Sequence, residues 1–247
     1  MNGRALVDFI WLAGGIAIAA GLVLSIGLAT TAVYAQHQPV GERFHIKATD
    51  LPAPFATPSA VNPPARVAVP AGPPWQVPLG FHVNAFATGL SHARWMTVAD
   101  NGDVFLAEPG AGHVRLLRDA DGDGRAEHSS VFVSGLQRPH GLVLHDGHLY
   151  IGSPSTIWRV AYSSGQTRAR SKPEPVTVQG ALGPGGGHWT RNLVFSGDGA
   201  KFFVTVGSHA NVGEEAEVRA SVHQFDAAGR GQRTFAGGLR NPVGIAR

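Results

Sequence analysis

The chain has 247 residues, enough for one or two domains, and its 33 glycines and 17 prolines favour a turn-rich β protein. The net charge is +3, but the basic residues are scattered singly, which excludes the clustered positive charge that nucleic-acid binding requires. Cysteine is absent, so disulfides and cysteine-bound metals are excluded and the compartment cannot be inferred from redox chemistry.

Residues 1–36 are predicted to be a signal-anchor or a signal peptide. Arg4 precedes an uncharged, largely apolar stretch over residues 9–35. This stretch exceeds the roughly 7–15 apolar residues of a secretory signal and reaches the roughly 20 of a spanning helix, which favours an uncleaved anchor. The small residues around Ala35 leave cleavage open as the alternative. Both interpretations place the rest of the chain outside the cytoplasm.

Residues 37–78 are predicted to be a proline-rich linker. Proline at high density removes backbone donors and favours the extended polyproline II conformation, so we expect a semi-rigid spacer between the membrane and the domain that follows. A strap packed along the flank of that domain is the alternative. Nine prolines carry this prediction: Pro52, Pro54, Pro58, Pro63, Pro64, Pro70, Pro73, Pro74 and Pro78.

The phrase Phe-x-x-Gly-Leu occurs three times, at residues 86–90, 132–136 and 235–239. The first interval is 46 residues and the second is 103, about twice as long. A period in this range marks stacked supersecondary units, of which propeller blades are the all-β kind. Because such units bury their faces against neighbours, an array that stops eight residues after its third copy is expected to be an incomplete domain.

Short alternating strands and tight turns fill each unit from residue 79 onward. Asp-Gly and Asn-Gly dipeptides between the strands supply the positive φ angles of tight hairpins. The sequence therefore predicts an all-β fold over residues 79–247, with about three blades and the start of a fourth at 240–245. The expected strands are 94–98, 104–107, 113–117, 140–144, 149–152, 157–160, 191–195 and 202–205.

Cationic and imidazole side chains recur where each unit enters its first strand. In a propeller these strands line the central channel, so such side chains converge near one axis. A ring of this kind suits a small anionic ligand, but the same side chains would also serve to bond backbone carbonyls between blades. The sequence leaves both interpretations open for Arg94, His140, Arg191 and the pair Arg240-Asn241.

Asp119, Asp121 and Asp123 alternate with small residues in a possible calcium loop. The twelfth position, which holds a glutamate in an EF-hand, is Ser130, so the loop is not that motif. Turns rich in Asp and Gly are also common without metal. No zinc spacing, nucleophile elbow or phosphate loop occurs elsewhere. The sequence therefore assigns no metal ligand.

Two longer phrases place a histidine and an Arg-Asn pair where the third and fourth units begin, at residues 185–195 and 238–246. With the blade spacing, they resemble the glucose/sorbosone dehydrogenase family of soluble-type quinoproteins, especially its sorbosone-dehydrogenase-like members. That family forms six-bladed propellers that hold pyrroloquinoline quinone (PQQ) with calcium and oxidise sugars. The resemblance covers residues 79–247, about the first half of the family's propeller.

The resemblance implies a role for three residues. His188 corresponds to the family's general base, and an imidazole with an ordinary pKa near 6.5 suits that role. Arg240 and Asn241 correspond to its cofactor-contacting pair, in which a guanidinium can bind a carboxylate or a quinone oxygen. The resemblance also implies a sugar substrate, PQQ and calcium as cofactors, and a periplasmic or membrane electron acceptor. With the N-terminal segment, it implies a location at the periplasmic side of the bacterial inner membrane if the segment is an anchor, or secretion to the periplasm if the segment is cleaved.

The chain departs from the family beside its histidine. Gly187 and Ser208 stand where better-known members carry acidic residues, and Asp198, Glu214 or Glu215 are candidates to replace that carboxylate. Two alternatives therefore remain: a propeller that binds a ligand or partner without chemistry, and a calcium-dependent lactonase-type hydrolase. The 247-residue chain alone is expected to be inactive and to be poorly soluble or self-associating.

Overall fold

The structure is a computed structural model that describes residues 41, 43–53, 55–56, 65, 68 and 75–247. It divides into two units, residues 1–52 and 53–247. The described part of the first holds one short 3₁₀ helix, η1 (Ala48–Asp50). The predicted signal segment 1–36 and about half of the predicted linker 37–78 lie outside the described residues. Within the described ranges, no helix has the length and apolarity needed to cross a membrane.

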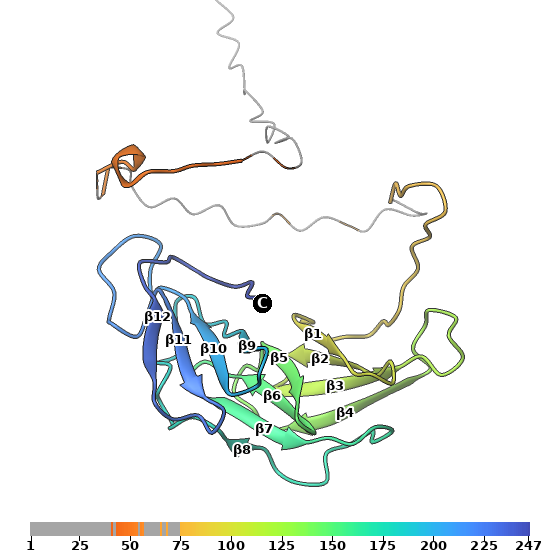
Figure 1. The fold of residues 1–247 in the computed structure, drawn as a ribbon. Helices are drawn as coiled ribbons and strands as arrows, with labels where there is room; N and C mark the ends of the chain where they lie inside the picture. Colours follow the sequence, from red (N-terminus) through yellow and green to blue (C-terminus); the bar gives the residue numbers. More distant parts are fainter. Residues whose placement is uncertain (1–40, 42, 54, 57–64, 66–67, 69–74) are drawn as a thin grey trace, which may run out of the picture. The chain divides into compact units, whose positions relative to one another are not determined.

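The second unit is built from three four-stranded sheets, which we call blades 1, 2 and 3 (Figure 1). Within each blade the four strands follow one another in chain order and pair antiparallel. The predicted all-β fold class is confirmed. The strands of blade 1 are β1 (Met96–Val98), β2 (Val104–Glu108), β3 (His113–Arg118) and β4 (His128–Ser134); of blade 2, β5 (Leu142–His145), β6 (His148–Gly152), β7 (Ile157–Ala161) and β8 (Glu174–Pro175); of blade 3, β9 (Leu193–Phe195), β10 (Lys201–Val206), β11 (Ser221–Asp226) and β12 (Arg233–Ala236).

The predicted hairpin turns form between the first two strands of each blade. In the turn between β5 and β6, Asp146 and Gly147 have φ angles of 44° and 67°. This left-handed pair is the backbone of a two-residue hairpin whose twist matches that of its strands. Gly102 and Gly199, with φ of 85° and 69°, lie in the corresponding turns of blades 1 and 3.

Two apolar cores lie between the blades. The first joins blades 1 and 2, where the rings of Phe105 and Phe132 meet edge to face at 4.9 Å and pack with Leu149 and Ile151. The second joins blades 2 and 3 and includes Leu182, Phe202 and Phe225, all almost fully buried. The innermost strands β1, β5 and β9 are neighbours in this order (Figure 1). The segments that enter these strands therefore meet around one axis.

The leucine of the repeated phrase holds each blade to its own second turn. Leu136 N–H donates to Gly112 O at 3.0 Å, and Leu239 N–H donates to Ala220 O at 2.8 Å. Leu182 N–H makes the corresponding bond to Ser155 O at 3.3 Å. Blade 2 keeps this leucine without the phenylalanine of the phrase, which explains why the second sequence interval is about twice the first.

Residues 240–245 do not form the strand that the sequence predicts for a fourth blade. Arg240 O accepts the Ser208 N–H at 2.7 Å, and Val243 O accepts a bond from Asn192 Nδ2. A strand requires a continuous ladder with a neighbour, and the described chain offers no further segment to supply it. This segment therefore lies extended along blade 3 without becoming part of a sheet.

The connections alternate between the two ends of the antiparallel blades. The segments entering β5 and β9, the β10–β11 loop and the segment after β12 share one end, which we call the entry end. The β1–β2, β3–β4, β5–β6 and β9–β10 turns lie at the opposite end. This division separates the predicted site residues, which lie at the entry end, from the acidic loop described below.

Candidate functional site

Main-chain hydrogen bonds bring three segments together around His188 at the entry end. His188 N–H donates to Ser208 O at 3.0 Å, and Ser208 N–H donates to Arg240 O at 2.7 Å. Between them, Gly207 has so little space that an added Cβ would lie 2.5 Å from both His188 Cβ and Asn241 Oδ1. The structure thus places the three predicted site residues next to one another, on the segments before β9 and after β12.

The hydrogen bonds of Ser208 determine which nitrogen of His188 carries the proton. His188 Nδ1 lies 3.0 Å from Ser208 O and 2.9 Å from Ser208 Oγ. The Ser208 hydroxyl donates its hydrogen to Ala210 O at 2.6 Å, so its oxygen is an acceptor toward the ring. Because both partners accept, Nδ1 carries the hydrogen, and the lone pair of the neutral ring lies on Nε2. Nε2 has no hydrogen-bond partner among the described residues and is available to accept a proton.

Close packing explains why Gly187 replaces the family's acidic residue. Its φ is +54°, in the left-handed region, and an added Cβ would collide with the carbonyl oxygen of His209. The carboxylates proposed as substitutes do not bond to His188 either. Glu215 accepts the N–H groups of His209 and Ala210 at 2.6 and 3.2 Å, while Asp198 bonds within its turn at the opposite end. A hydroxyl and a carbonyl therefore orient the imidazole.

Arg240 and Asn241 present an exposed cation and an unpartnered acceptor beside this imidazole. Arg240 Nη2 donates to Asn211 Oδ1 at 2.5 Å, and its Nε lies 3.4 Å from Asn211 O. The rest of the guanidinium is exposed. Asn241 Oδ1 is buried and has no hydrogen-bond partner among the described residues. An unsatisfied buried acceptor is costly, so this oxygen is suited to receive a donor from a ligand or a water.

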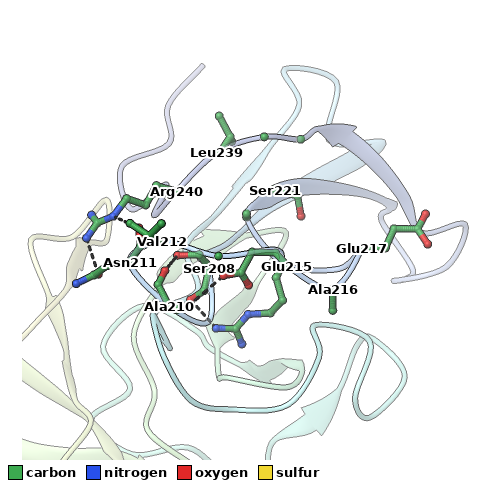
Figure 2. A pocket seen from close by; sticks show the side chains of 15 residues that line it. Ser208, Ala210, Asn211, Val212, Glu215, Ala216, Glu217, Ser221, Leu239 and Arg240 are labelled. Atoms are coloured by element: carbon green, nitrogen blue, oxygen red, sulfur yellow. Dashed lines mark hydrogen bonds between the residues drawn. The ribbon is translucent and has the colours of Figure 1, made fainter. Parts of the chain in front are cut away.

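A pocket of about 480 Å³ opens beside Ser208, between the β10–β11 loop and the segment that leads to Arg240 (Figure 2). Glu215 closes the loop through its two backbone bonds. Burial would raise the pKa of this carboxyl, but the N–H groups of His209 and Ala210 outweigh burial and hold it below the ordinary value. Glu215 thus fixes the wall of the pocket as an ionised side chain; Ser208 and Arg240 line the pocket, and His188 does not.

Of the two other arginines in the predicted ring of cations, Arg191 is buried and Arg94 is exposed. Arg191 is fully buried, and its guanidinium donates to the carbonyls of His188, Thr190 and Leu182 at 3.0, 2.9 and 3.3 Å. Burial, together with the nearby Arg219, lowers the pKa of Arg191 to about 9. For Arg191, the structure therefore supports the interpretation that it bonds backbone carbonyls. Arg94 is exposed.

Asn192 and Arg219 are two important residues that the sequence analysis missed. Asn192 Oδ1 accepts from Nδ1 of the buried His140 at 2.9 Å, while its Nδ2 donates to Val243 O. The signal for it was present, since Arg191-Asn192 repeats the dipeptide Arg240-Asn241 at the equivalent position of a blade. Arg219 lies in the β10–β11 loop and belongs to no motif, so only the folded structure shows its contacts.

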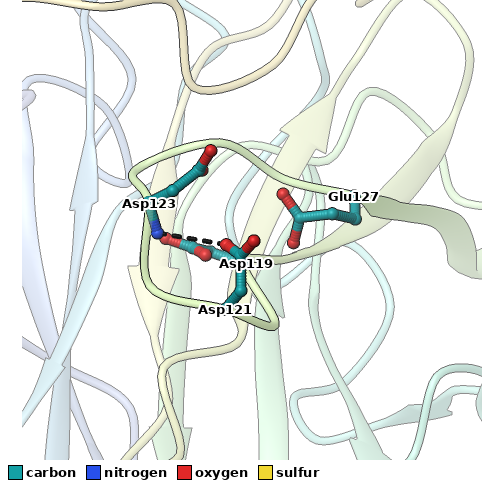
Figure 3. Close-up of side chains that lie close together, drawn as sticks. All are labelled: Asp119, Asp121, Asp123 and Glu127. Carbon is teal, nitrogen blue, oxygen red and sulfur yellow. Dashed lines mark hydrogen bonds between the residues drawn. The ribbon is translucent and has the colours of Figure 1, made fainter.

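The acidic loop between β3 and β4 lies at the opposite end from His188. Carboxylate oxygens of Asp119, Asp121, Asp123 and Glu127 lie within 4.8 Å of one another (Figure 3). Asp119 accepts the N–H groups of Gly122 and Gly124 at 2.7 and 2.9 Å, and these bonds lower its pKa. Backbone donors thus hold the loop, and its position separates it from the site around His188.

Comparison with known protein families establishes the relationship of the chain. A family model described as TrAA12-like matches residues 75–247. The chain belongs to the TrAA12-like family. No curated protein sequence matches it. The match begins close to the predicted start of the blades and includes His188, Arg240 and Asn241.

Two solved structures show that the TrAA12-like chain shares a fold with sugar dehydrogenases. One is the holo form of the pyranose dehydrogenase PQQ domain from Coprinopsis cinerea, with a TM-score of 0.57 and 23% identity. The other is a putative oxidoreductase (glucose dehydrogenase) from Thermus thermophilus, with a TM-score of 0.50 and 21% identity. The similarity covers 65% and 67% of this chain, but only 42% and 57% of theirs. The resemblance to quinoprotein sugar dehydrogenases is therefore confirmed in fold, and the family model assigns the chain to the TrAA12-like family.

Proposed function

We propose that this chain is the N-terminal part of a PQQ-dependent dehydrogenase that oxidises an aldose or a sorbosone-type sugar, with His188 as its general base. The observation that carries the proposal is the imidazole of His188, held through Nδ1 with Nε2 open, beside Arg240 and Asn241. A base needs this arrangement, because its lone pair must face the substrate. Membership of the TrAA12-like family and the fold shared with a PQQ domain support it.

The residues beside His188 fit a planar anionic cofactor. The exposed guanidinium of Arg240 offers donors that match a carboxylate, and the buried Asn241 Oδ1 needs a hydrogen-bond donor. We therefore propose that Arg240 and Asn241 contact PQQ. When bound, PQQ supplies the two-electron acceptor for a hydride.

The chemistry required of the protein is removal of one proton. Oxidation of a hemiacetal hydroxyl removes the hydroxyl proton and the hydride on the same carbon. We assign the proton to His188 Nε2, which leaves an imidazolium with hydrogen on both nitrogens. Ser208 O and Oγ retain their bonds to Nδ1 throughout, so the ring stays in place as it gains charge. Arg240 would add positive charge beside the bound cofactor, which would favour its reduced form.

Calcium is proposed as the second cofactor on the family resemblance alone. Among the described residues, the cluster with metal-ligand geometry is the acidic loop, which lies at the opposite end from His188. We therefore assign calcium no ligand in this chain.

We propose that the three blades form half of a six-bladed ring. On β1, Met96 and Val98 are 59% and 62% exposed and lie on the face turned away from blade 2, because their partners in β2 alternate with the buried Phe105. On blade 3, Phe203 and Phe235 meet at 4.9 Å on the face opposite to the core with blade 2. Uncovered apolar faces on both outer blades are what further blades would bury.

The experiment is dye-linked oxidation of aldoses and sorbosone by the complete gene product, with PQQ and calcium, for the native protein and His188→Ala. We expect turnover that the variant loses by about 10²-fold or more. Absence of turnover, or turnover unchanged in His188→Ala, would overturn the proposal. Hydrolysis of lactones without dye would establish the lactonase alternative. Glycan binding without PQQ and without turnover would establish the non-catalytic one.

We also propose that the protein acts at the periplasmic side of the bacterial inner membrane and passes electrons to a periplasmic or membrane acceptor. The support is the apolar stretch over residues 9–35, with Arg4 before it. Fractionation and protease treatment of spheroplasts test this location. A protein that resists external protease until the membrane is lysed would contradict it.

A further inference from the structure

Arg219 connects the two segments that orient His188. This arginine is 5% exposed, and its Nη1 donates to Pro184 O at 2.9 Å. Its Nη2 donates to Gly186 O at 2.9 Å and to Ser208 O at 2.7 Å. One planar guanidinium thus ties the loop that leads into His188 to the residue that accepts the His188 Nδ1 hydrogen.

Ser208 O is the point at which these contacts meet. It accepts from His188 N–H, from His188 Nδ1–H and from Arg219 Nη2, at 3.0, 3.0 and 2.7 Å. The shortest of the three bonds comes from the charged donor, which fixes the direction of the carbonyl. Hydrogen bonds that share an acceptor inside a protein also polarise one another. The position of this oxygen, and with it the imidazole, therefore depends on Arg219.

Arg219 has no carboxylate partner within 4 Å among the described residues, and its Nε is buried without a hydrogen-bond partner. Glu215 is near enough for its pKa to be lowered by the charge of Arg219, after the larger effect of its own backbone bonds. A buried guanidinium without an ion pair is expensive. Its bonds to the carbonyls of Pro184, Gly186 and Ser208 offset this cost, and these carbonyls lie on the two segments that orient His188.

We propose that Arg219 is a positioning residue for the base: through Ser208 O and the loop at Pro184 and Gly186, it holds His188 in the Nδ1–H tautomer with Nε2 open. This inference rests on the proposed function for the role of His188, but the tautomer itself does not. Without Arg219, the entry loop and the Ser208 carbonyl lose their common anchor. The ring is then free to place its hydrogen on Nε2, and in that tautomer Nε2 has no lone pair with which to accept a proton.

The direct test is nitrogen-15 NMR of the histidine rings in the complete gene product, at a pH where His188 is neutral, with its signals assigned by His188→Gln. We expect native His188 to show a protonated Nδ1 and an unprotonated Nε2. Arg219→Met should move a large part of the population to the Nε2–H form, and Arg219→Lys should restore at least part of the Nδ1–H form. Native His188 in the Nε2–H form, or an unchanged tautomer in Arg219→Met, would overturn the inference.

Arg191→Met is the matched control. Arg191 is a buried neighbour whose guanidinium donates to the carbonyls of His188, Thr190 and Leu182 and, within the described part of the chain, makes no hydrogen bond to Ser208. We expect this variant to keep the Nδ1–H tautomer even where it lowers stability, so a shift equal to that of Arg219→Met would overturn the inference. If Arg219→Met does not fold, Ser208→Ala removes one of the two acceptors of Nδ1 and should weaken the same tautomer. The inference would also be refuted if native His188 is in the Nε2–H form and both Ser208→Ala and Arg219→Lys show the same tautomer as the native protein.

Kinetics of the complete gene product separate this inference from the proposed function. Arg219→Met should lower kcat by about 10- to 100-fold with little change in KM. This is less than the roughly 10²–10⁴-fold that a positioned base contributes, because the variant keeps His188. A chain with the expected tautomers and no sugar oxidation would remove the enzymatic proposal and leave the positioning of His188 intact. Sugar oxidation with kcat and tautomer both unaffected by Arg219→Met would keep the enzymatic proposal and remove the positioning role of Arg219.

Discussion

Ser208 Oγ lies 2.9 Å from His188 Nδ1, at a position where better-known quinoprotein sugar dehydrogenases carry an aspartate. A hydroxyl orients the ring as a carboxylate does, but it adds no negative charge to stabilise the imidazolium. Glu215, in the loop that follows Ser208, is engaged by the backbone of His209 and Ala210. The electrostatic support of the base therefore differs from that family pattern, and this difference can be measured.

Ser208→Asp is expected to move the acid limb of the kcat/KM profile to higher pH. A carboxylate beside Nδ1 favours the protonated ring, which cannot act as a base, so activity falls at a higher pH than in the native protein. The pH dependence of dye-linked oxidation by the complete gene product measures the shift. Ser164→Asp, in the exposed loop after β7, is the matched control and should leave the limb in place. A limb at the same pH in Ser208→Asp and native protein would contradict the assignment of His188.

Gly207→Ala is expected to abolish the site while the blades still form. Its Cβ would lie 2.5 Å from His188 Cβ and from Asn241 Oδ1, so these two residues must move apart. We expect loss of PQQ binding, as measured by fluorescence titration, and a fall of about 10²-fold or more in kcat/KM. Gly197→Ala is the control, because its Cβ meets only Arg247 Nη1 at 3.7 Å at the opposite end. Native-like binding by Gly207→Ala would show that the site is not assembled around this glycine.

Asp103 is expected to control acid stability. It accepts two bonds from Arg118, at 2.6 and 2.8 Å, and one from Tyr162 of blade 2 at 2.9 Å. Burial would raise its pKa, but these bonds and one from Asn101 hold it below the ordinary 3.8. Because the folded-state pKa is lower than the unfolded one, this stabilisation is present above about pH 4 and is lost as the pH falls through the folded-state value.

Asp103→Asn should therefore lower the free energy of unfolding at pH 7 and reduce its further loss below about pH 4, as measured by urea denaturation at several pH values. Tyr162→Phe removes one donor and keeps the carboxylate. It should cost about 1 kcal/mol at pH 7 and retain most of the acid dependence. Equal acid dependence in native protein and Asp103→Asn would assign acid stability to other groups, such as the buried Glu108.

The uncovered faces of blades 1 and 3 are expected to make the 247-residue chain associate. Phe235 is 60% exposed and packs on Phe203 on an open sheet face. We expect concentration-dependent association in sedimentation equilibrium at micromolar concentration, weakened in Phe235→Ser. Val178→Ser changes a 79% exposed valine on a loop and should have little effect. A chain that stays monomeric at high concentration would count against the six-bladed ring.

The sequence predicts the blades well because turn chemistry and alternation are local. Asp146-Gly147 favours the left-handed backbone of a two-residue hairpin, and the alternating strands on either side pair across that turn. The strand expected at 240–245 fails for the opposite reason. Its apolar residues match the pattern, but a strand depends on a neighbour that the local sequence does not specify.

The site was only partly predictable from the sequence. The resemblance brings His188, Arg240 and Asn241 forward as a set, and the structure places them side by side. The role of Ser208 depends on the path of the loop to Ala210, and that of Arg219 depends on three carbonyls contributed by two segments. Contacts between loops of this kind leave no periodic signal, so they appear only in the folded chain.

The side-chain amide of Asn192 joins three successive entry segments. It bonds His140 before blade 2 and Val243 after blade 3, and Asn192 itself lies before blade 3. A displacement of one entry segment is therefore expected to displace the next one through these bonds, so the entry segments around the axis should move together. The site would then form late in folding, after neighbouring blades have packed together. A blade that forms alone would contain His188 without the contacts that orient its ring.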